Sequence, residues 1–384
     1  MKTIGKVLMV LILFISNMAM AASSLSPTPA EVSAKLSELF LTTDPDLYKP
    51  IGYKAPKAYG GGQLIHYSVV SLWVNALECA RLSNNSELEK RLVAAFEPAY
   101  NEKKIWMNNY RHVDLSIVGA IAIEIYILTG DERAKALGLR YADRQWEEPK
   151  EDCDWGDKWY EKITLEERRE NWGKGYSPET RLWIDDMYMI SVLQGLAYRA
   201  TNDRKYIERS AKEMCLYLKR LQREDGLFNH APSAPFAWGR GNGWMAAAMA
   251  MNLALLPKDS EWREPILADY IKMMKALKEK QRPNGLWGQI VDDEESYDET
   301  SASAMFAYAF AEGAKAGVLD DEYLAAAKRA YNALVARLDE YGNISDVCVG
   351  TGWKNDRHHY LTRPRANGDP HGQAPLLWLC KALL

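Results

Sequence analysis

Apolar residues recur every three or four positions along most of the chain, which is the spacing of amphipathic helices. The clearest cases are VDLSIVGAIAIEIYILTGDERAKALGLRYADRQ (113–145) and YIERSAKEMCLYLKRLQ (206–222). Alternation of apolar and polar residues, which marks a half-buried strand, does not extend far enough anywhere to predict a sheet. The pattern therefore predicts an all-α fold.

An amphipathic helix recurs along the chain as an internal repeat. The last three copies run into glycine turns at Gly226, Gly285 and Gly342, which are 59 and 57 residues apart. This period fits a helical hairpin, which cannot bury its own apolar face and must stack on neighbours. About six hairpins fit into the chain. We predict that they close into an (α/α)6 toroid, although an open solenoid has the same period. The copies are 129–145, 201–228, 268–287 and 319–344.

The composition is that of a globular protein, and it favours a ligand with sugar rings. Hydrophobic residues make up 47% of the 384 positions and charged residues 26%, enough for a large core. We expect one catalytic domain over residues 22–384. The 13 tryptophans and 21 tyrosines far outnumber the 7 phenylalanines. Such rings suit a pocket that stacks on sugars and offers polar edges, although a bulky core between helices accounts for most of them.

The charge pattern argues against several classes of partner. The 48 basic and 52 acidic side chains give a net charge of -4, and no basic run stands out. We therefore expect neither nucleic acid nor an anionic membrane surface as a partner, but a small molecule. Histidines and cysteines lack the spacing of metal ligands, so no metal or other cofactor is expected. The five cysteines are expected to be buried thiols: Cys79, Cys153, Cys215, Cys348 and Cys380.

The first residues have the pattern of a secretory signal peptide. Lys2 and Lys6 precede an apolar run at 7–15, and the small-residue pattern Ala-Met-Ala follows at 19–21. Cleavage after Ala21 would export the protein to the periplasm or the medium. No cysteine follows the cleavage point, so no lipid anchor is expected.

Four segments place polar and aromatic residues where apolar helices begin. His66 and Tyr67 enter a helix in GGGQLIHYSVVSLW (60–73), where a hydrogen-bonded structural role is the alternative for the histidine. Asp114 precedes a very apolar helix in NNYRHVDLSIVGA (108–120), where the alternative is a helix N-cap.

The third segment, RLWIDDMYMISVLQGLAY (181–198), carries two adjacent carboxylates among apolar residues. Side chains of adjacent helical residues point about 100° apart, so only one of Asp185 and Asp186 can face a given pocket. A desolvated aspartate has a raised pKa and can donate a proton near neutral pH. The alternative is a buried salt bridge.

The fourth segment combines GLFNHAPSAP (226–235) with WGRGNGW (238–244). It brings His230, Arg240 and Trp244 into one connection between helices. An arginine that grips a carboxylate beside a ring that stacks on a sugar is the combination a uronic acid requires. The alternative is a turn at a helix start with a solvated Arg240.

Five motifs carry a resemblance to a known family. They are WIDDMYM (183–189), WGRGNGW (238–244), YDETSASAMFAYAFAEGAKAG (297–317), GTGW (350–353) and GDPHGQAPLL (368–377). From about Tyr67 to the C-terminus they resemble the unsaturated uronyl hydrolases of glycoside hydrolase family 105 and, more distantly, family 88. The resemblance implies an (α/α)6 barrel that hydrates the C4=C5 double bond of a terminal unsaturated uronate.

The resemblance also implies roles for single residues. Asp185 resembles the general acid and base, and Asp114 the second aspartate, which holds sugar hydroxyls and helps to position water. Asp186 fits less well, because the family's aspartate stands two residues after the tryptophan. The expected contacts with the sugar are His66, Tyr67, His230, Arg240 and Trp244, with His371 and Ser301 near the rim.

Two departures from the family pattern concern the leaving sugar. A histidine is expected shortly before the catalytic helix, where this chain offers Lys174, and the insertion at 151–170 has no counterpart. The favoured substrate is a rhamnogalacturonan disaccharide, with an ulvan-type glucuronyl-rhamnose as a close variant. The alternatives from other classes are an (α/α) sugar epimerase, for which His358 and His359 are the paired histidines, and a non-catalytic oligosaccharide-binding protein. A monomer is expected.

Overall fold

The computed structural model describes residues 25–43, 65–100, 111–152 and 163–384. Within these ranges the only paired strands are β1 (Val347–Cys348) and β2 (Arg365–Ala366), which are antiparallel and two residues long. All other regular elements are helices. The prediction of an all-α fold is confirmed.

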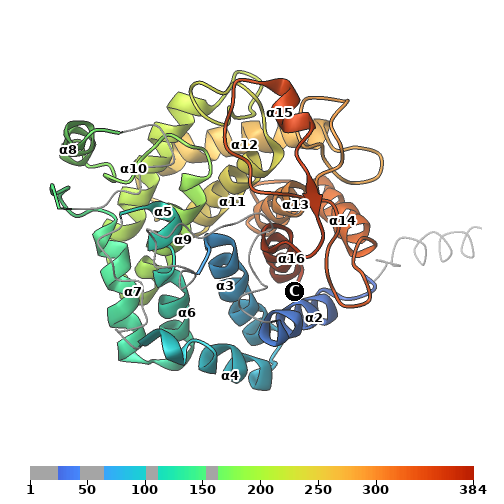
Figure 1. Cartoon of the computed structure of the whole chain (residues 1–384), viewed down its shortest axis with the longest axis horizontal. Helices are drawn as coiled ribbons and strands as arrows, with labels where there is room; N and C mark the ends of the chain where they lie inside the picture. The colour runs from blue at the N-terminus through green and yellow to red at the C-terminus, as the bar shows by residue number, and fades with distance from the viewer. Residues whose placement is uncertain (1–24, 44–64, 101–110, 153–162) are drawn as a thin grey trace, which may run out of the picture.

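Six long helices form an inner ring (Figure 1). Each contacts the next in the ring, and the last of them, α16, packs against the first, α3. This contact closes the circle, so the toroid is confirmed and the open solenoid is excluded. The inner helices are α3 (Tyr67–Leu82), α6 (Gly119–Thr129), α9 (Asp186–Thr201), α11 (Gly239–Leu255), α13 (Thr300–Lys315) and α16 (Pro370–Leu383).

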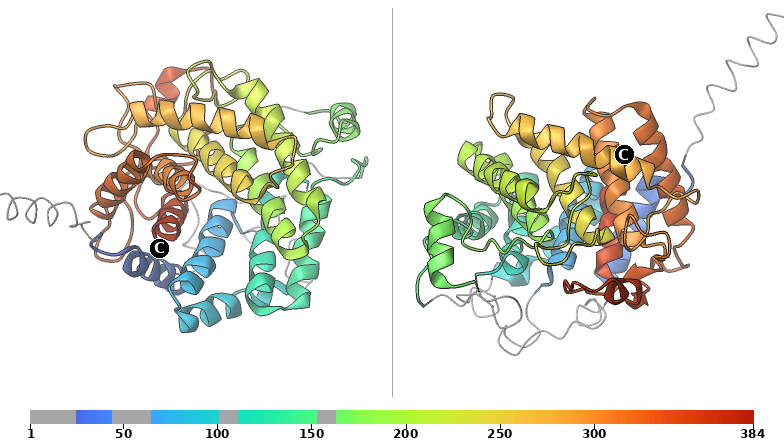
Figure 2. Two further views of the ribbon diagram at one scale, coloured as in Figure 1. Left: turned by 180° about the vertical axis from the view of Figure 1, so that it is seen from behind. Right: turned by 90° about the horizontal axis from the view of Figure 1, so that it is seen from above.

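A second set of helices surrounds this ring (Figure 2). They are α2 (Pro29–Thr42), α4 (Ser86–Ala94), α7 (Glu132–Arg144), α10 (Arg204–Leu221), α12 (Arg263–Glu279) and α14 (Asp321–Val335). Four short helices lie in the connections: η2 (Glu97–Tyr100), α5 (Val113–Ser116), α8 (Leu165–Gly173) and α15 (Arg357–Leu361). None of the helices in the described ranges is both long and apolar enough to span a bilayer.

The sequence of each helix decides its layer. Inner helices such as α11, GRGNGWMAAAMAMNLAL, are buried on nearly every side and have no polar face. Outer helices such as α10, RKYIERSAKEMCLYLKRL, have one buried apolar stripe and a charged face toward water. A helix that is apolar all round is stable only when protein surrounds it.

The predicted glycine turns connect outer helices to the inner helices that follow them. Gly226, Gly285 and Gly342 have φ angles of 94°, 89° and 102°, a backbone conformation that costs other residues free energy. At Gly226 a Cβ atom would also lie 2.7 Å from the carbonyl oxygen of Lys272, too close for any side chain. The internal repeat is therefore a structural repeat.

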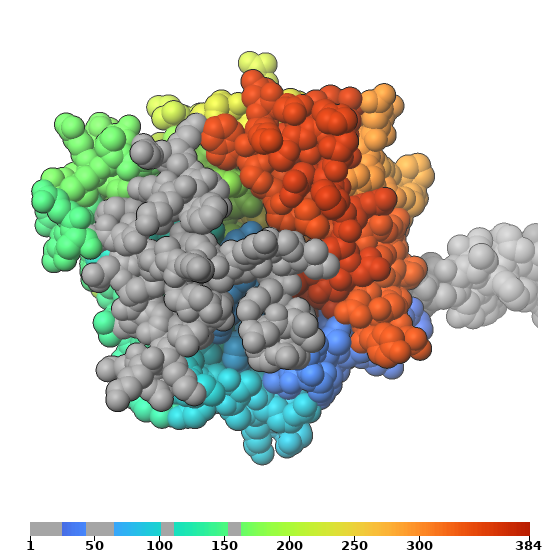
Figure 3. Space-filling view, viewed as in Figure 1, coloured from blue at the N-terminus to red at the C-terminus, as the bar shows by residue number. Residues whose placement is uncertain are grey.

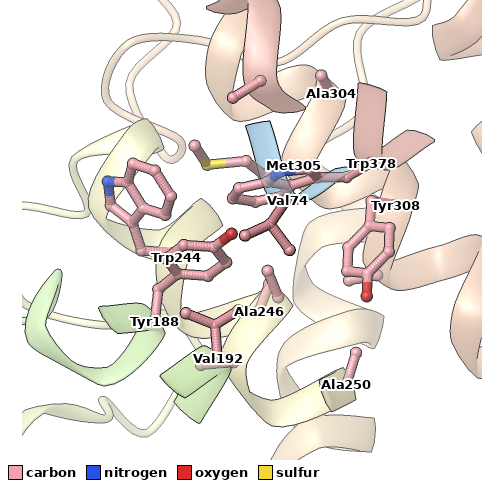
Figure 4. Close-up of a cluster of buried hydrophobic side chains, with 14 of the residues drawn as sticks. Val74, Tyr188, Val192, Trp244, Ala246, Ala250, Ala304, Met305, Tyr308 and Trp378 are labelled. Atoms are coloured by element: carbon pink, nitrogen blue, oxygen red, sulfur yellow. The ribbon is translucent and has the colours of Figure 1, made fainter. Parts of the chain in front are cut away.

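Aromatic side chains fill the centre of the ring (Figure 4). Tyr188 of α9 stacks on Trp378 of α16 with 4.6 Å between ring centroids, and Trp244 of α11 lies 4.6 Å from Tyr188. The middle of the barrel is thus a packed core, so a ligand must bind at one of its ends.

The inner helices begin at a common end. Tyr67 at the start of α3 is hydrogen-bonded to His371 at the start of α16, with 2.9 Å between Oη and Nε2. Glu299, the N-cap of α13, accepts a hydrogen bond from the Cys348 amide, whose carbonyl accepts one from Arg240 of α11. Helix N-termini carry partial positive charge, so this end of the barrel favours an anion.

The other end of the barrel carries a buried ion cluster. Glu78 of α3 pairs with Lys381 of α16 at 2.8 Å and with Arg199 of α9 at 3.0 Å. Arg199 also contacts Glu124 of α6 at 3.3 Å. Burial raises the pKa of Glu124 to about 7, and the negative charge of Glu78 adds to this effect. These groups link inner helices from the first and last hairpins.

The cysteines in the described ranges are free thiols. Cys79, Cys348 and Cys380 are buried and Cys215 is half-buried. Burial raises the pKa of Cys79 to about 12, so it stays a protonated thiol at neutral pH. Cys153 and the predicted signal peptide lie outside the described residues.

Candidate active site

Asp185 lies at the end of the barrel where the inner helices begin. It occupies the N-cap position of α9, but its side chain makes no capping hydrogen bond. Only 8% of the residue is exposed, and within the described ranges its Oδ2 atom accepts no hydrogen bond. A buried carboxyl oxygen without a partner is costly, which is typical of a group reserved for a ligand.

His230 is an ionisable neighbour of Asp185, with 3.6 Å between Nε2 and Oδ2. Indole can only donate, so the 2.8 Å contact from Trp183 Nε1 shows that His230 Nε2 carries no hydrogen. The other nitrogen, Nδ1, then donates to the hydroxyl of Tyr360 at 2.8 Å. Burial lowers the pKa of His230, so it is neutral and provides no positive charge that would hold Asp185 in an ion pair.

Asp186, in contrast to Asp185, is fully buried and has hydrogen-bond partners for its carboxylate. The Arg181 guanidinium pairs with its carboxylate, and Tyr217 donates a hydrogen bond to Oδ2 at 2.9 Å. The buried salt bridge considered from the sequence therefore belongs to Asp186. Asp185 is left as the carboxyl group that can act on a ligand.

Asp114 is the second carboxyl group of this region. It lies inside α5, whose N-cap is His112, so the N-cap alternative for Asp114 is wrong. Burial raises its pKa to about 7, against the positive charge of Arg181 at 3.7 Å. The charges of Asp186 and Asp185 raise this pKa further, which places all three carboxyl groups in one electrostatic cluster. A carboxyl group with such a pKa exchanges a proton readily near neutral pH.

His66, Tyr67 and His371 form one group beside the starts of α3 and α16. His66 is the N-cap of α3, and its Nδ1 accepts a hydrogen bond from the Ser68 amide at 3.3 Å. The structural alternative for His66 is thus what the fold shows. His371 is 1% exposed and bonds to Tyr67, so it lies behind the tyrosine and not at a rim. Tyr67 itself is half-buried.

Arg240 has a different environment from the one expected. Its two terminal nitrogens donate to the carbonyl oxygens of Cys348 and Val349, at 2.5 and 3.0 Å, and the residue is 1% exposed. Main-chain acceptors take one hydrogen from each terminal nitrogen, while the buried Nε atom has no hydrogen-bond partner among the described residues, so the bidentate grip on a substrate carboxylate stays a prediction. The solvated alternative is wrong, because the side chain is buried. What Arg240 supplies to this end of the barrel is a buried positive charge.

Two further expectations, for Trp244 and Ser301, are corrected by burial. Trp244 is fully buried against Tyr67, Tyr188 and Trp378, so it belongs to the core beneath the site. Ser301 is fully buried and donates to Glu299 instead of lying near the rim. Lys174 is the C-cap of α8 and pairs with Glu170 on the surface.

The paired histidines do not form an epimerase site. His358 is exposed, and the side chain of His359 contacts the carbonyl oxygen of Gly352. Both lie on α15, in the C-terminal segment that is visible at the surface in Figure 3. Two opposed acid and base groups are not present in this pair.

Several site residues escaped the sequence interpretation. Arg181 and His112 stand in the same motifs as Asp186 and Asp114, and Asp369 stands two residues before His371. The available signal was an ionisable residue within five positions of each candidate. Tyr360 had none, because it reaches His230 from 130 positions further along the chain. Within the described ranges no group of His, Cys, Asp and Glu side chains could hold a metal ion.

Comparisons with known proteins show the family to which this chain belongs. The model of Glycosyl Hydrolase Family 88 matches residues 60–383. The Unsaturated 3S-rhamnoglycuronyl hydrolase of Formosa agariphila is 28% identical over 184 residues, covering 43% of this chain and 49% of that protein. The Unsaturated rhamnogalacturonyl hydrolase YesR of Bacillus subtilis is 33% identical over 127 residues, covering 33% of this chain and 35% of that protein.

Similarity of fold extends over nearly the whole chain. The crystal structure of a possible GH105 member from Salmonella enterica superposes with a TM-score of 0.76 at 17% identity, covering 94% of this chain and 95% of that one. The resemblance drawn from the sequence motifs is confirmed. Because the family model spans most of the chain, this protein belongs to glycosyl hydrolase family 88, in the group it forms with family 105, and is a glycosidase.

Proposed function

We propose that this glycosidase removes a 4,5-unsaturated uronic acid from the non-reducing end of oligosaccharides released by polysaccharide lyases. The observation that carries the proposal is the buried Oδ2 atom of Asp185, which accepts no hydrogen bond from the described residues. A carboxyl group that is left free for a ligand can give its proton to an electron-rich double bond. The convergent helix N-termini and the buried Arg240 favour the carboxylate that makes the sugar a uronate.

The reaction needs one acid and one water molecule. Asp185 in its protonated form gives its proton to C4, while water adds its oxygen to C5 and returns a proton to the Asp185 carboxylate. The hemiketal formed at C5 then opens and releases the second sugar. One carboxyl group serves both steps, so the spacing of two carboxyl groups that governs ordinary glycosidases does not apply.

A rhamnose-linked uronate is the proposed substrate. The matched relatives from Formosa agariphila and Bacillus subtilis carry names that combine an unsaturated uronyl group with rhamnose. We favour the rhamnogalacturonan disaccharide, which is also the substrate favoured from the sequence. The ulvan-type glucuronyl-rhamnose is the second candidate, and the Formosa agariphila relative supports it.

Loss of ultraviolet absorbance tests this function. The conjugated unsaturated uronate absorbs, and hydration removes the chromophore, whereas binding or epimerisation leaves it. Digests of rhamnogalacturonan, ulvan and glycosaminoglycans by their lyases should be incubated side by side with the protein. Loss of absorbance in the rhamnogalacturonan digest is expected. Unchanged absorbance in every digest would contradict the proposal.

We also propose that the protein is exported and acts as a monomer. The pattern of residues 1–21 supports export to the periplasm or the medium. Cell fractionation should place the mature chain, beginning after Ala21, outside the cytoplasm. Light scattering should give the mass of one chain.

A further inference from the structure

Three residues from distant parts of the sequence form a chain of hydrogen bonds beside the site. Tyr67 Oη lies 2.9 Å from His371 Nε2, and His371 Nδ1 lies 2.8 Å from Asp369 Oδ1. Asp369 is the N-cap of α16 and also accepts the His371 amide at 2.9 Å. Asp369 and His371 are each about 1% exposed, so water does not compete with these bonds.

The direction of the hydrogen bonds follows from the charge on Asp369. The pKa of Asp369 is lowered to about 2 although burial opposes this, because His371 and its amide stabilise the carboxylate. A carboxylate only accepts, so Nδ1 of His371 must carry the hydrogen. The reverse tautomer would place a lone pair of Nδ1 against a carboxylate oxygen at 2.8 Å.

The tautomer of His371 decides whether the Tyr67 hydroxyl donates a hydrogen bond to it or accepts one. Burial lowers the pKa of His371, so the ring is neutral and Nε2 has no hydrogen. The tyrosine hydroxyl must therefore donate its only hydrogen to Nε2. Any other group that meets Tyr67 Oη finds a lone pair and has to be a donor.

Tyr67 lies at the same end of the barrel as Asp185. It is the first residue of α3, at the end of the barrel where α9 also begins, and it is half-buried. The negative charge of Asp185 acts on His371 directly behind it. A uronate carboxylate has no hydrogen to donate at neutral pH, whereas the sugar's hydroxyl groups do.

We propose that Asp369 and His371 are positioning residues that make Tyr67 a hydrogen-bond acceptor for a hydroxyl group of the unsaturated uronate. The inference rests on the proposed function. It places one hydroxyl group of the sugar at Tyr67, beside the starts of α3 and α16.

Nuclear magnetic resonance of the histidine rings tests the tautomer without a substrate. The chain has six histidines, so ¹⁵N-histidine labelling gives a simple spectrum, and His371→Gln identifies the signal. We expect the neutral Nδ1–H tautomer for His371 at neutral pH. An Nε2–H tautomer or an imidazolium ring would overturn the inference.

A double-mutant cycle tests the link to the substrate. Tyr67→Phe and His371→Leu should each lower kcat/KM for the unsaturated galacturonosyl-rhamnose disaccharide by about tenfold. The double variant should be no worse than the poorer single variant, because His371 acts through Tyr67. His371→Gln, whose amide oxygen can replace Nε2 as acceptor, should recover part of the activity. His358→Gln on the exposed face of α15 is the matched control.

The outcomes distinguish a failure of this inference from a failure of the proposed function on which it rests. An active wild type with additive losses in the double variant would overturn the role of Tyr67 and leave the function intact. A wild type that turns over no unsaturated disaccharide would overturn the proposed function and the substrate contact with it.

Discussion

Asp185 and Asp186 are adjacent in the chain, yet only Asp186 is held by a guanidinium group. Arg181 and Tyr217 both bond to Asp186, while His230, which is neutral, lies 3.6 Å from Asp185. The turn of the helix separates the two carboxyl groups by about 100°, so one serves the fold and the other is left for a ligand.

Asp185→Asn should abolish activity and leave the fold intact. The amide keeps the shape of the carboxyl group but cannot give a proton to C4, so kcat should fall by about a hundredfold or more. Loss of ultraviolet absorbance measures the rate, and thermal unfolding should give an unchanged Tm.

Asp186→Asn is the matched control for this variant. It leaves Arg181 buried without its main partner and should lower the free energy of unfolding by about 3 kcal/mol. If Asp186→Asn abolished activity at full stability while Asp185→Asn kept wild-type turnover, the two roles would have to be exchanged.

Asp114→Asn should remove one limb of the pH profile. Asp114 is expected to accept hydrogen bonds from sugar hydroxyls and water, for which it must be ionised. With a pKa of about 7, this form increases as the pH rises, so kcat/KM of the wild type should rise through about pH 7. The variant should be roughly tenfold less active above that pH and lack the rise. A rise of equal size in the variant would show that another group titrates there.

Arg240→Lys should act on stability more than on substrate binding. A lysine keeps the charge but cannot donate to the carbonyls of Cys348 and Val349 together, so unfolding should become easier by about 1–3 kcal/mol. Thermal unfolding and KM should be measured together, with the exposed Arg365→Lys as control. A large rise in KM at unchanged Tm would contradict this prediction and support the direct carboxylate contact that the sequence suggested.

Glu124→Gln should flatten the dependence of stability on pH. The ordinary pKa of this glutamate is 4.5, and in the folded protein it is about 7. Between these values the folded chain binds more protons than the unfolded chain, so its free energy of unfolding falls as the pH rises through this window. Glu179 and Glu213, whose pKa values are also raised to about 7 by burial, contribute in the same direction.

The fall in stability between about pH 5 and pH 8 should therefore be smaller in the Glu124→Gln variant by about 1 kcal/mol or more. Urea unfolding at both pH values measures it, and the exposed Glu148→Gln is the control. Equal slopes in wild type and variant would mean that Glu124 stays ionised throughout.

The helical pattern was enough to predict an all-α fold of stacked hairpins, and the motifs were enough to predict the family. The period set by Gly226, Gly285 and Gly342 reports how hairpins stack, and the apolar inner helices report their burial. Ring closure could not be read from that period, because it depends on the contact between α3 and α16, which are far apart in the chain.

Side-chain roles were predicted less completely than the fold. Helical geometry predicted that only one of Asp185 and Asp186 can face a pocket, and the resemblance to the family assigned that role to Asp185. The structural partners of Arg240 and Trp244 could not be predicted, because Val349 and Trp378 are more than a hundred positions away. A motif shows which residues stand together in the chain, but not which distant main-chain atoms already occupy them.

The packing of α16 against α3 has a consequence for the biogenesis of this enzyme. Both His371, behind Tyr67, and Lys381, in the ion cluster at the far end, belong to the last of the inner helices to be translated. Until α16 has emerged from the ribosome, the nascent polypeptide has neither a closed ring nor a complete binding end. Closure of the ring therefore has to wait until this helix docks against α3.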